Sequence, residues 1–490
     1  MLAFVSLCML LLVGHWLRTR VRLLQWMYLP ACVIAGLVGL GLLAGLNYLV
    51  PESPSQAVGW QAWVVAVHAE VSTWTAVWGK LPGFLINVVF ACLFMGVTLP
   101  KFSSLLRRGG IQLAYGQVVA WGQYVVGIGL VLALLGGMYG LKDTFGGILP
   151  VGFEGGHGTA AGLTETFDEL GWPEGKDFAL ASATGGILSA IIVGMVLVNI
   201  ATRRGWTAAR VSPADVPEDD SIGIIPVDRR PSAGKLTVKS DAIESFTLHL
   251  ALVGVAVLIG YLLKQGLAQI DNIPAVQEKL QEAYRQVHTK AVAQSGPKKF
   301  FGTIPEFPLC MVGGLVVQIW EQKFDRHKLI DLGLIRRIQN SSLDFLVVAA
   351  IATINLAVIS KGMTPLLILI GAGIAWNVFC VLVLARRLLP DAWFERSIAE
   401  MGQSMGVTAT GLLLLRVVDP DYKTSAADAF ATKQLMHEPI MGGGLWTTFA
   451  IPLLAVWGGW KVFLVCLAAV AFWLVILIVA RVLRSRALAS

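Results

Sequence analysis

The stretch Gly152–Gly162 reads Gly-Phe-Glu-Gly-Gly-His-Gly-Thr-Ala-Ala-Gly and interrupts a chain that is otherwise mostly apolar. It holds five glycines and no Leu, Ile or Val. Glycine weakens a helix, and irregular backbone at membrane depth is tolerated only where protein buries it or water reaches it. We therefore expect this stretch to line a cavity, with the other segments arranged to hold it there.

Composition sets the class of protein. The chain has 490 residues, of which 56% are hydrophobic and 14% charged, and its mean hydropathy is +0.70. These values are typical of a polytopic membrane protein and exclude a set of soluble domains. The net charge of +7 is explained by a basic excess in cytoplasmic loops, so we expect no nucleic-acid partner.

The cysteines point to no cofactor. They lie inside apolar runs without CxxC spacing, which is typical of small buried hydrophobic residues and not of a metal site or a disulfide. The six are Cys8, Cys32, Cys92, Cys310, Cys380 and Cys466.

Apolar runs predict eleven membrane spans, and the N-terminal run has no basic residue before it and no cleavage site, so it reads as a span and not as a signal peptide. The spans are Met1–Leu17, Leu23–Val50, Phe84–Leu99, Leu113–Gly137, Phe178–Ala201, Phe246–Leu263, Ile304–Trp320, Leu343–Ile359, Leu366–Ala385, Pro439–Trp457 and Val462–Ala480.

The loops between the spans differ in character. Pro51–Lys80 is expected to be a loop whose tryptophans form an amphipathic segment at the membrane interface. Residues 202–245 are charged and rich in Pro and Asp, and we expect a cytoplasmic linker there. Lys264–Lys299 is polar and is expected to form a surface helix followed by a loop.

Basic residues predict the orientation. With the N-terminus outside and the C-terminus in the cytoplasm, the cytoplasmic segments hold most of the 38 Lys and Arg residues, as the positive-inside rule requires. The polar segment Met138–Asp177 then enters from outside, and Arg386–Lys433 enters from inside. Both are too polar and too rich in glycine to cross as one simple helix.

Two sequence matches indicate an inverted repeat. Pro30, Cys32 and Gly36 of the second span align with Pro308, Cys310 and Gly314 of the seventh. In the polar segments, Gly158-Thr159-Ala160-Ala161-Gly162 stands where the second half has Val407-Thr408-Ala409-Thr410-Gly411. Two matches in the same order, in halves of opposite orientation, are the pattern of a secondary transporter.

The predicted fold is therefore an all-α polytopic membrane protein with two inverted five-helix repeats, each with a re-entrant hairpin, plus one extra C-terminal transmembrane helix. The predicted parts are residues 1–201 (hairpin about 140–170), the linker 202–245, residues 246–457 (hairpin about 396–418), and the extra helix with its basic tail, 458–490.

Hairpin tips of this kind bind ligands through main chain. Half-helix N-termini favour anions, and unwound carbonyls coordinate cations such as Na⁺. Hydroxyl groups of Thr159, Thr408 and Thr410 are candidate Na⁺ ligands together with hairpin carbonyls, although each could instead bond back to its own helix. The remaining candidates for binding substrate or ion are Gly155, Gly156, His157, Gly158, Gln403, Ser404 and Gly406.

The run Gly155-Gly156-His157-Gly158-Thr159 resembles the GGHGT signature of the bacterial sodium/glutamate symporters. The resemblance implies a dimeric scaffold with a mobile transport core that works as an elevator, in the bacterial inner membrane. It also implies Na⁺-coupled uptake of an acidic amino acid between two hairpin tips, with Na⁺ as the coupling ion and no other cofactor. The expected partners are a small anionic solute, glutamate first, together with Na⁺, the lipid bilayer and a second copy of the chain.

The chain departs from the family pattern at two places. The second hairpin keeps Thr408 and Thr410 but lacks the proline that the resemblance leads us to expect. Glu154 stands where a small polar residue is expected, and its carboxylate would repel a glutamate side chain unless it were protonated or paired with a cation. Another small carboxylate, coupled to Na⁺ or H⁺, therefore remains an alternative substrate.

Single polar residues have two interpretations each. His157 is either a proton or substrate partner or a neutral imidazole that orients the hairpin. Glu154 is either a cation ligand or, as we slightly favour, a group in water at the outer mouth. Asn87 and Asn355 are secondary candidates, since amides in spans more often bridge helices.

Two other classes are less favoured. A channel filter is usually built from symmetric repeats that enter from one side, whereas the two hairpins here are expected to enter from opposite faces. An intramembrane enzyme using His157 and Glu154 finds no HExxH motif. The chain is therefore expected not to be an enzyme.

Overall fold

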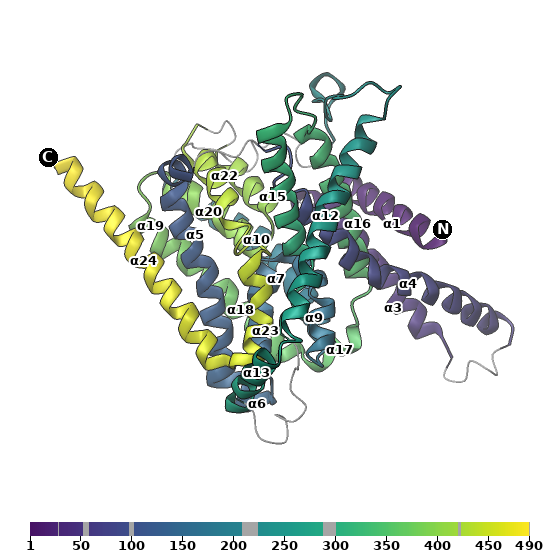
Figure 1. The fold of residues 1–490 in the computed structure, drawn as a ribbon. Helices are drawn as coiled ribbons and strands as arrows, with labels where there is room; N and C mark the ends of the chain where they lie inside the picture. Colours follow the sequence, from purple (N-terminus) through teal and green to yellow (C-terminus); the bar gives the residue numbers. More distant parts are fainter. Residues whose placement is uncertain are drawn as a thin grey trace. The chain divides into compact units, whose positions relative to one another are not determined.

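The computed structural model describes residues 1–27, 29–51, 58–97, 102–207, 224–287, 300–419 and 423–489. All regular structure in this part of the chain is helical, which confirms the all-α prediction (Figure 1). The helices fall into two compact units, each built from three separate stretches of chain.

Eight described helices are long and apolar enough to cross a membrane, and they correspond to eight of the eleven predicted spans. The other three predicted spans are occupied by α15 (Phe307–Phe324), α16 (Leu332–Ala352) and α23 (Leu445–Trp457). Glu321 and Lys323 lower the apolar character at one end of α15, charged residues do the same to α16, and α23 is short. The eight helices mark a multi-pass membrane protein.

The prediction of a loop over Pro51–Lys80 is wrong for most of its length. Helix α4 runs without a break from Trp60 to Ala91 and so includes only the first part of the predicted third span, Phe84–Leu99; residues 92–97 are not helical. Pro82 lies inside it, and neighbouring helices in a membrane can satisfy the carbonyl that a proline leaves unpaired. The run has few charged residues, so nothing in it opposes a helix.

The two polar connections are partly described. Lys264–Lys299 begins with the end of α12 (Ser245–Ile270) and continues as α13 (Pro274–Val287), which confirms the expected surface helix; residues 288–299 lie outside the described residues. In the predicted linker, residues 208–223 also lie outside them, and residues 224–244 contain only the short 3₁₀ turn η5 (Val227–Arg229).

The first unit comprises residues 1–97, 218–260 and 309–361. Its helices approach each other closely at glycines: a Cβ on Gly36 of α3 would lie 2.7 Å from Ile351 Cβ of α16, and one on Gly314 of α15 would lie 2.0 Å from the Ala91 carbonyl oxygen of α4. Small residues allow this packing between membrane helices. The unit also contains α1 (Leu2–Arg20), α2 (Arg22–Trp26), α3 (Ala31–Leu49) and α17 (Leu356–Lys361).

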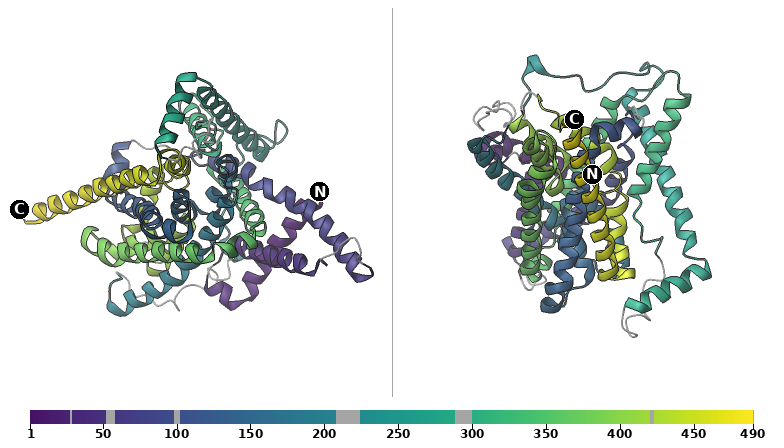
Figure 2. Two further views of the ribbon diagram at one scale, coloured as in Figure 1. Left: turned by 90° about the horizontal axis from the view of Figure 1, so that it is seen from below. Right: turned by 90° about the vertical axis from the view of Figure 1, so that its left-hand side faces the viewer.

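The second unit comprises residues 98–217, 261–308 and 362–490. Its long central helix α5 (Phe102–Leu130) packs beside α24 (Gly459–Ala489) and α22 (Ala426–His437). In Figure 2, α5 and α24 lie side by side. The other long helices are α10 (Gly175–Arg204) and α18 (Met363–Phe379).

Shorter helices complete the second unit. They are η2 (Val131–Leu135), α6 (Gly136–Tyr139), η3 (Asp143–Gly147), α7 (Ile148–Phe153), α8 (Gly156–Gly162), α9 (Thr164–Glu169), η6 (Cys380–Ala385), α19 (Arg386–Leu388), α20 (Trp393–Met405) and α21 (Thr408–Val418). Two of them, η2 and η6, are π-helical turns that end α5 and α18 respectively.

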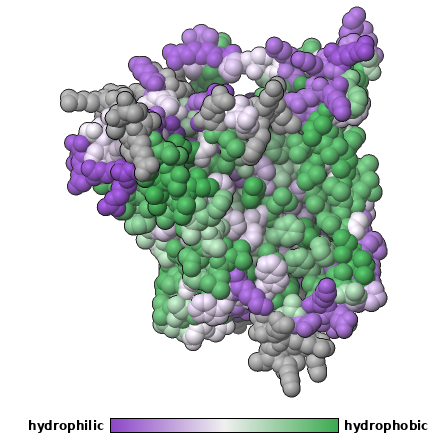
Figure 3. Space-filling view, turned by 60° about the vertical axis from the view of Figure 1, so that its left-hand side comes forward, coloured by the Kyte–Doolittle hydropathy of each residue, from purple (hydrophilic) through white to green (hydrophobic). Residues whose placement is uncertain are grey.

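One face of the molecule carries a broad hydrophobic surface, with hydrophilic residues gathered towards its two ends (Figure 3). Many large apolar side chains of α24 are exposed, among them Leu464, Phe472 and Val475. Such side chains are favourable against lipid hydrocarbon and unfavourable in water, which agrees with a membrane location.

Candidate functional site

The stretch that opened the sequence analysis forms a pair of short helices, α7 and α8, against α10. Phe145 contacts Phe178 near the start of α10, and a Cβ on Gly152 would lie 2.6 Å from the Ser182 hydroxyl farther along it. The chain then turns at Glu154 and Gly155. His157 bonds to Thr184, so α8 starts beside the middle of α10 and leads back towards its beginning.

The second pair, α20 and α21, is folded back on itself more tightly. A Cβ on Gly402 would lie 2.8 Å from Gly411 Cα, and one on Gly411 would lie 2.4 Å from the Ala399 carbonyl oxygen. Glycine at both positions lets the two backbones touch. The turn between the helices is Gly406-Val407, and Val407 is extended, with φ −141° and ψ 164°.

The tips of the two pairs lie next to each other on α10. A Cβ on Gly156 would lie 3.5 Å from Val407 Cγ1 and 3.6 Å from the Gly406 carbonyl oxygen. Gly156 itself has φ +67°, a conformation that only glycine adopts readily. Gly186 of α10 touches both pairs, since a Cβ there would lie 2.3 Å from the Met405 carbonyl oxygen and 2.9 Å from the Phe153 ring.

A buried lysine on α22 supports the second pair. Lys433 is fully buried, and its ammonium donates to Glu400 Oε1 at 2.6 Å, to Gln403 Oε1 at 2.9 Å and to Gln434 Oε1 at 2.8 Å. Three acceptors satisfy all three N–H donors of an ammonium group. A Cβ on Gly116 of α5 would lie 2.5 Å from Glu400 Oε1, so this glycine leaves room for the ion pair.

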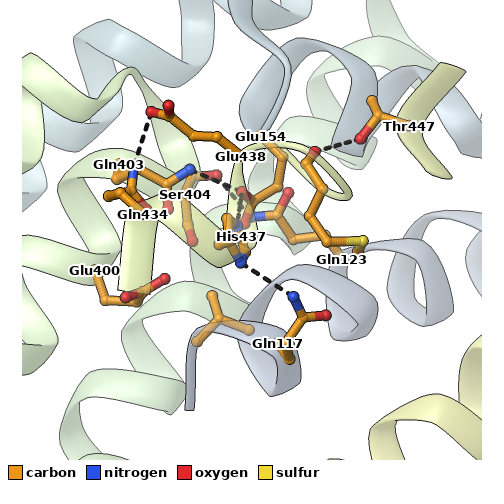
Figure 4. Close-up of polar contacts among 12 residues, drawn as sticks. Gln117, Gln123, Glu154, Glu400, Gln403, Ser404, Gln434, His437, Glu438 and Thr447 are labelled. Atoms are coloured by element: carbon orange, nitrogen blue, oxygen red, sulfur yellow. Dashed lines mark hydrogen bonds and ion pairs between the residues drawn. The ribbon is translucent and has the colours of Figure 1, made fainter. Parts of the chain in front are cut away.

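Glu154 at the first tip contacts residues from two other helices (Figure 4). Its Oε2 atom accepts from Gln403 Nε2 at 3.0 Å and lies 3.3 Å from His437 Nε2. The other ring nitrogen of His437, Nδ1, lies 3.3 Å from Gln117 Nε2 on α5. Glu154 is 4% exposed, so the interpretation that it lies in water at the outer mouth is wrong: packing against α20 and α22 encloses it.

Thr408 begins α21 and has polar partners on α22. Its hydroxyl donates to Glu438 Oε1 and accepts from Gln434 Nε2 at 2.6 Å. It therefore bonds to another helix and not back to its own. The first N–H groups of a helix have no intrahelical acceptor, so the start of α21 offers donors beside this hydroxyl.

His157 is buried and its bonding identifies its tautomer. The Thr184 hydroxyl donates to the Leu180 carbonyl oxygen, so it accepts from His157 Nε2, at 2.9 Å. A histidine that uses its N–H to hold α8 against α10 fits the interpretation of a neutral, orienting imidazole. Thr159 of the same helix is fully buried, and its hydroxyl has no hydrogen-bond partner among the described residues.

The structure brings most of the predicted site residues into the second unit, around the two tips. They are Glu154, Gly155, Gly156, His157, Gly158, Thr159, Gln403, Ser404, Gly406, Thr408 and Thr410. Asn87 and Asn355 belong to the first unit instead. Asn355 accepts from Ala357 N and Val358 N at the start of α17, which is a capping role.

Sequence reasoning missed the polar face of α22. Lys433, Gln434, His437 and Glu438 follow the spacing i, i+1, i+4 and i+5, which places them on one side of a helix. Lys433 is the last residue of the polar segment Arg386–Lys433, and the other three residues lie before the predicted tenth span, Pro439–Trp457, so neither predicted element contains this face. Partners on α5, such as Gln117 and Gln123, sit in an otherwise apolar span, and such polar residues usually face protein.

The groups around the two tips are polar main chain and side chains of several kinds. Within the described ranges, no three His, Cys, Asp or Glu side chains are grouped to hold a metal ion. What converges instead is main chain at two helix tips, hydroxyl groups, amides and a few compensated charges.

Comparison with known proteins agrees with this picture. The family model described as sodium/glutamate symporter matches residues 46–276, a range that contains α7, α8 and α10 but not the second helix pair. No curated protein and no solved structure matches the chain. The match supports the family that the GGHGT run indicated.

Proposed function

We propose that this chain, a member of the sodium/glutamate symporter family through residues 46–276, transports glutamate or a related small acidic amino acid together with Na⁺. The observation that carries the proposal is the meeting of Gly156 with Gly406 and Val407 on α10. Two broken helices that expose main chain to one point are a recurring solution for binding charged solutes within a membrane.

The start of α21 supports an anion at this point. Its N-terminal N–H groups and the helix dipole favour a carboxylate, and the Thr408 hydroxyl lies beside them. Glu438, bonded to Thr408, offers a carboxylate that can accept from the ammonium group of an amino acid. Recognition of both charges would favour an amino acid over a plain carboxylate.

Oxygen atoms at the two tips are suited to Na⁺, a hard cation that takes carbonyl and hydroxyl ligands. We assign Thr159, Thr408 and Thr410 to this role, with carbonyl groups of the hairpins. The Thr159 hydroxyl is buried without a partner, and Thr410 Oγ1 would lie 3.0 Å from a Cβ placed on Gly406.

Packing in the first unit supports an inverted repeat. Gly36 of α3 packs on α16, and the matching Gly314 of α15 packs on α4. If α3 corresponds to α15 and α4 to α16, the two contacts are equivalent: in each, a helix of one repeat packs through its glycine on the partner helix of the other repeat.

The second unit gives parallel support. The π-helical turns η2 and η6 begin at Val131 and Cys380, which are as far apart in sequence as Thr159 and Thr408. The first part of the chain contributes residues 1–97 to the first unit and 98–217 to the second, and the rest of the chain follows the same order twice. We infer two re-entrant hairpins carried by a mobile second unit, and an elevator movement against a first unit that forms the scaffold of a homodimer.

We also propose a membrane topology for the chain. Basic residues favour an N-terminus outside and a cytoplasmic C-terminus, and family membership favours the bacterial inner membrane. The first hairpin then opens to the outside and the second to the cytoplasm, which is the arrangement that alternating access needs.

The central prediction concerns uptake. Purified protein in proteoliposomes should accumulate labelled glutamate when NaCl is outside and KCl inside. This accumulation should stop when an ionophore collapses the Na⁺ gradient. Empty liposomes and equal NaCl on both sides are the controls. If no amino or carboxylic acid is accumulated under a Na⁺ gradient, the proposed function is wrong.

Thr408→Val tests the second tip. Valine keeps the shape but loses the two hydrogen bonds to α22, so the ratio of maximal rate to KM for glutamate should fall by about tenfold or more. Thr408→Ser keeps a hydroxyl and should retain most of the uptake. Equal uptake by Thr408→Val and the wild type would remove Thr408 from the site.

A proton-coupled transporter of another small carboxylate is the second candidate, because Glu154 and His437 are two titratable groups in contact at the site. Uptake driven by a pH gradient without Na⁺ would favour it. A channel would instead equilibrate solute without accumulating it. The same assay therefore distinguishes a Na⁺-coupled transporter, a proton-coupled transporter and a channel.

A further inference from the structure

A chain of hydrogen bonds from α5 fixes the tautomer of His437. Trp121 Nε1 donates to Gln117 Oε1 at 2.8 Å, and an indole N–H is a donor only. The amide of Gln117 therefore presents its Nε2 group to His437, at 3.3 Å from Nδ1. Nδ1 must be the acceptor, so His437 carries its single proton on Nε2 and is neutral.

The same reasoning fixes Gln403. Lys433 donates to Gln403 Oε1, so the Nε2 group of this amide is the one that faces Glu154. Two oriented donors, Gln403 Nε2–H and His437 Nε2–H, thus converge on a single atom, Glu154 Oε2.

This arrangement leaves the charge of Glu154 without a cationic contact. The three N–H groups of Lys433 donate to Glu400, Gln403 and Gln434, and the charge of Lys433 is balanced by Glu400. His437 is neutral, and the remaining acidic group of α22, Glu438, is bonded to Thr408 and Gln434. Glu154 Oε1 has no hydrogen-bond partner in the part of the chain that the structure describes, and a buried carboxylate in this condition is costly.

Other oxygen atoms without partners lie next to it. Gln123 Nε2 donates to the Ser404 carbonyl oxygen at 2.7 Å, while Gln123 Oε1 and the Ser404 hydroxyl have no hydrogen bond among the described residues. The Ser404 side chain faces Glu154, and Figure 4 shows Gln123 and Ser404 in the same cluster of polar residues as Glu154. Gln123 and Ser404 are fully buried.

We infer that Glu154 Oε1 binds one of the transported Na⁺ ions, with Ser404 Oγ and Gln123 Oε1 as further ligands. A carboxylate, an amide oxygen and a hydroxyl form a set that suits a hard cation, and one positive charge balances the one carboxylate left over. The enclosure of these atoms favours a small ion over the ammonium group of the solute. The inference rests on the proposed Na⁺ coupling and deepens it by placing one ion.

The test is Na⁺ binding without solute. Detergent-purified protein is titrated with NaCl, with choline chloride keeping the ionic strength constant, and the Na⁺-dependent rise in Tm is measured together with equilibrium binding of ²²Na⁺. Glu154→Gln should weaken the apparent Na⁺ affinity by about 100-fold or more, since even partners that only orient a metal ligand contribute about 10–100-fold. Glu165→Gln, at an exposed carboxylate, is the matched control and should bind as the wild type does.

Trp121→Phe tests how the ligand is held. The variant removes the donor that orients Gln117 and leaves every proposed ligand in place, so Na⁺ affinity should fall by about tenfold. A purely structural role of Trp121 would lower Tm at all salt concentrations without changing the Na⁺ dependence, and that result would contradict the orienting chain.

The outcomes are separable. If Glu154→Gln keeps the wild-type Na⁺ affinity, the inference is overturned. Loss of pH-dependent uptake in that variant would then identify Glu154 as a proton site, and loss of glutamate-dependent stabilisation would identify it as the ammonium partner. If the wild type itself neither binds Na⁺ nor accumulates solute under a Na⁺ gradient, the proposed function fails and not only this placement.

Discussion

Lys433→Met should lower the free energy of unfolding by about 3–5 kcal/mol, because it leaves the Glu400 carboxylate buried and unpaired. Both side chains of this ion pair are completely enclosed. Unfolding of the detergent-purified protein, followed by heat or by denaturant, measures the effect. The acceptor oxygens of Gln403 and Gln434 also lose their common donor, so we expect the second helix pair to lose its fixed position and transport to disappear.

The double variant Lys433→Met with Glu400→Gln separates charge from packing. It removes both charges and keeps an oxygen that can accept from Gln112 Nε2, which bonds to Glu400 Oε2 at 2.9 Å. Most of the lost stability should return. Lys264→Met is the comparison at a surface pair, Lys264 with the exposed Glu165, and should cost less than about 1 kcal/mol. A double variant as unstable as the single one would show that the charges are not the cause.

Gly186→Ala should abolish transport while leaving the protein in the membrane. The new Cβ would meet the Met405 carbonyl oxygen at 2.3 Å and the Phe153 ring at 2.9 Å. Neither is the free end of a flexible side chain, so one of the two tips has to move. Solute and ion sites at such tips depend on geometry, and a displacement of about 1 Å can cost about 100-fold in rate.

The neighbouring residue provides the control. The three atoms nearest to a Cβ on Gly185 all belong to the Ile370 side chain, of which the closest is Cδ1 at 3.0 Å, and this methyl group can move aside. Gly185→Ala changes the same helix by the same methyl group and should transport within about twofold of the wild type. Equal loss in both variants would mean that α10 itself, and not the contact between the tips, was damaged.

The sequence determined much of what depends on local pattern. Apolar runs located eight helices long enough to cross a membrane, and the glycines of Gly152–Gly162 correctly marked a break in the helical pattern. The GGHGT run indicated the same family whose model matches residues 46–276. One failure has a local cause too: the tryptophans of Pro51–Lys80 are typical of an interfacial loop, yet they are also compatible with the helix that α4 forms from Trp60 onward.

Charge compensation was decided only by the tertiary structure. From the sequence alone, Glu154 was expected to lie in water at the outer mouth, because a sequence shows a charged residue but not the residues that contact it. Its neighbours Gln403 and His437 come from parts of the chain more than half its length away. The residues that orient His437, namely Gln117 and Trp121, come from α5. Burial of a charged or amide group depends on which helices enclose it, and packing sets that, not the residue's own neighbours in sequence.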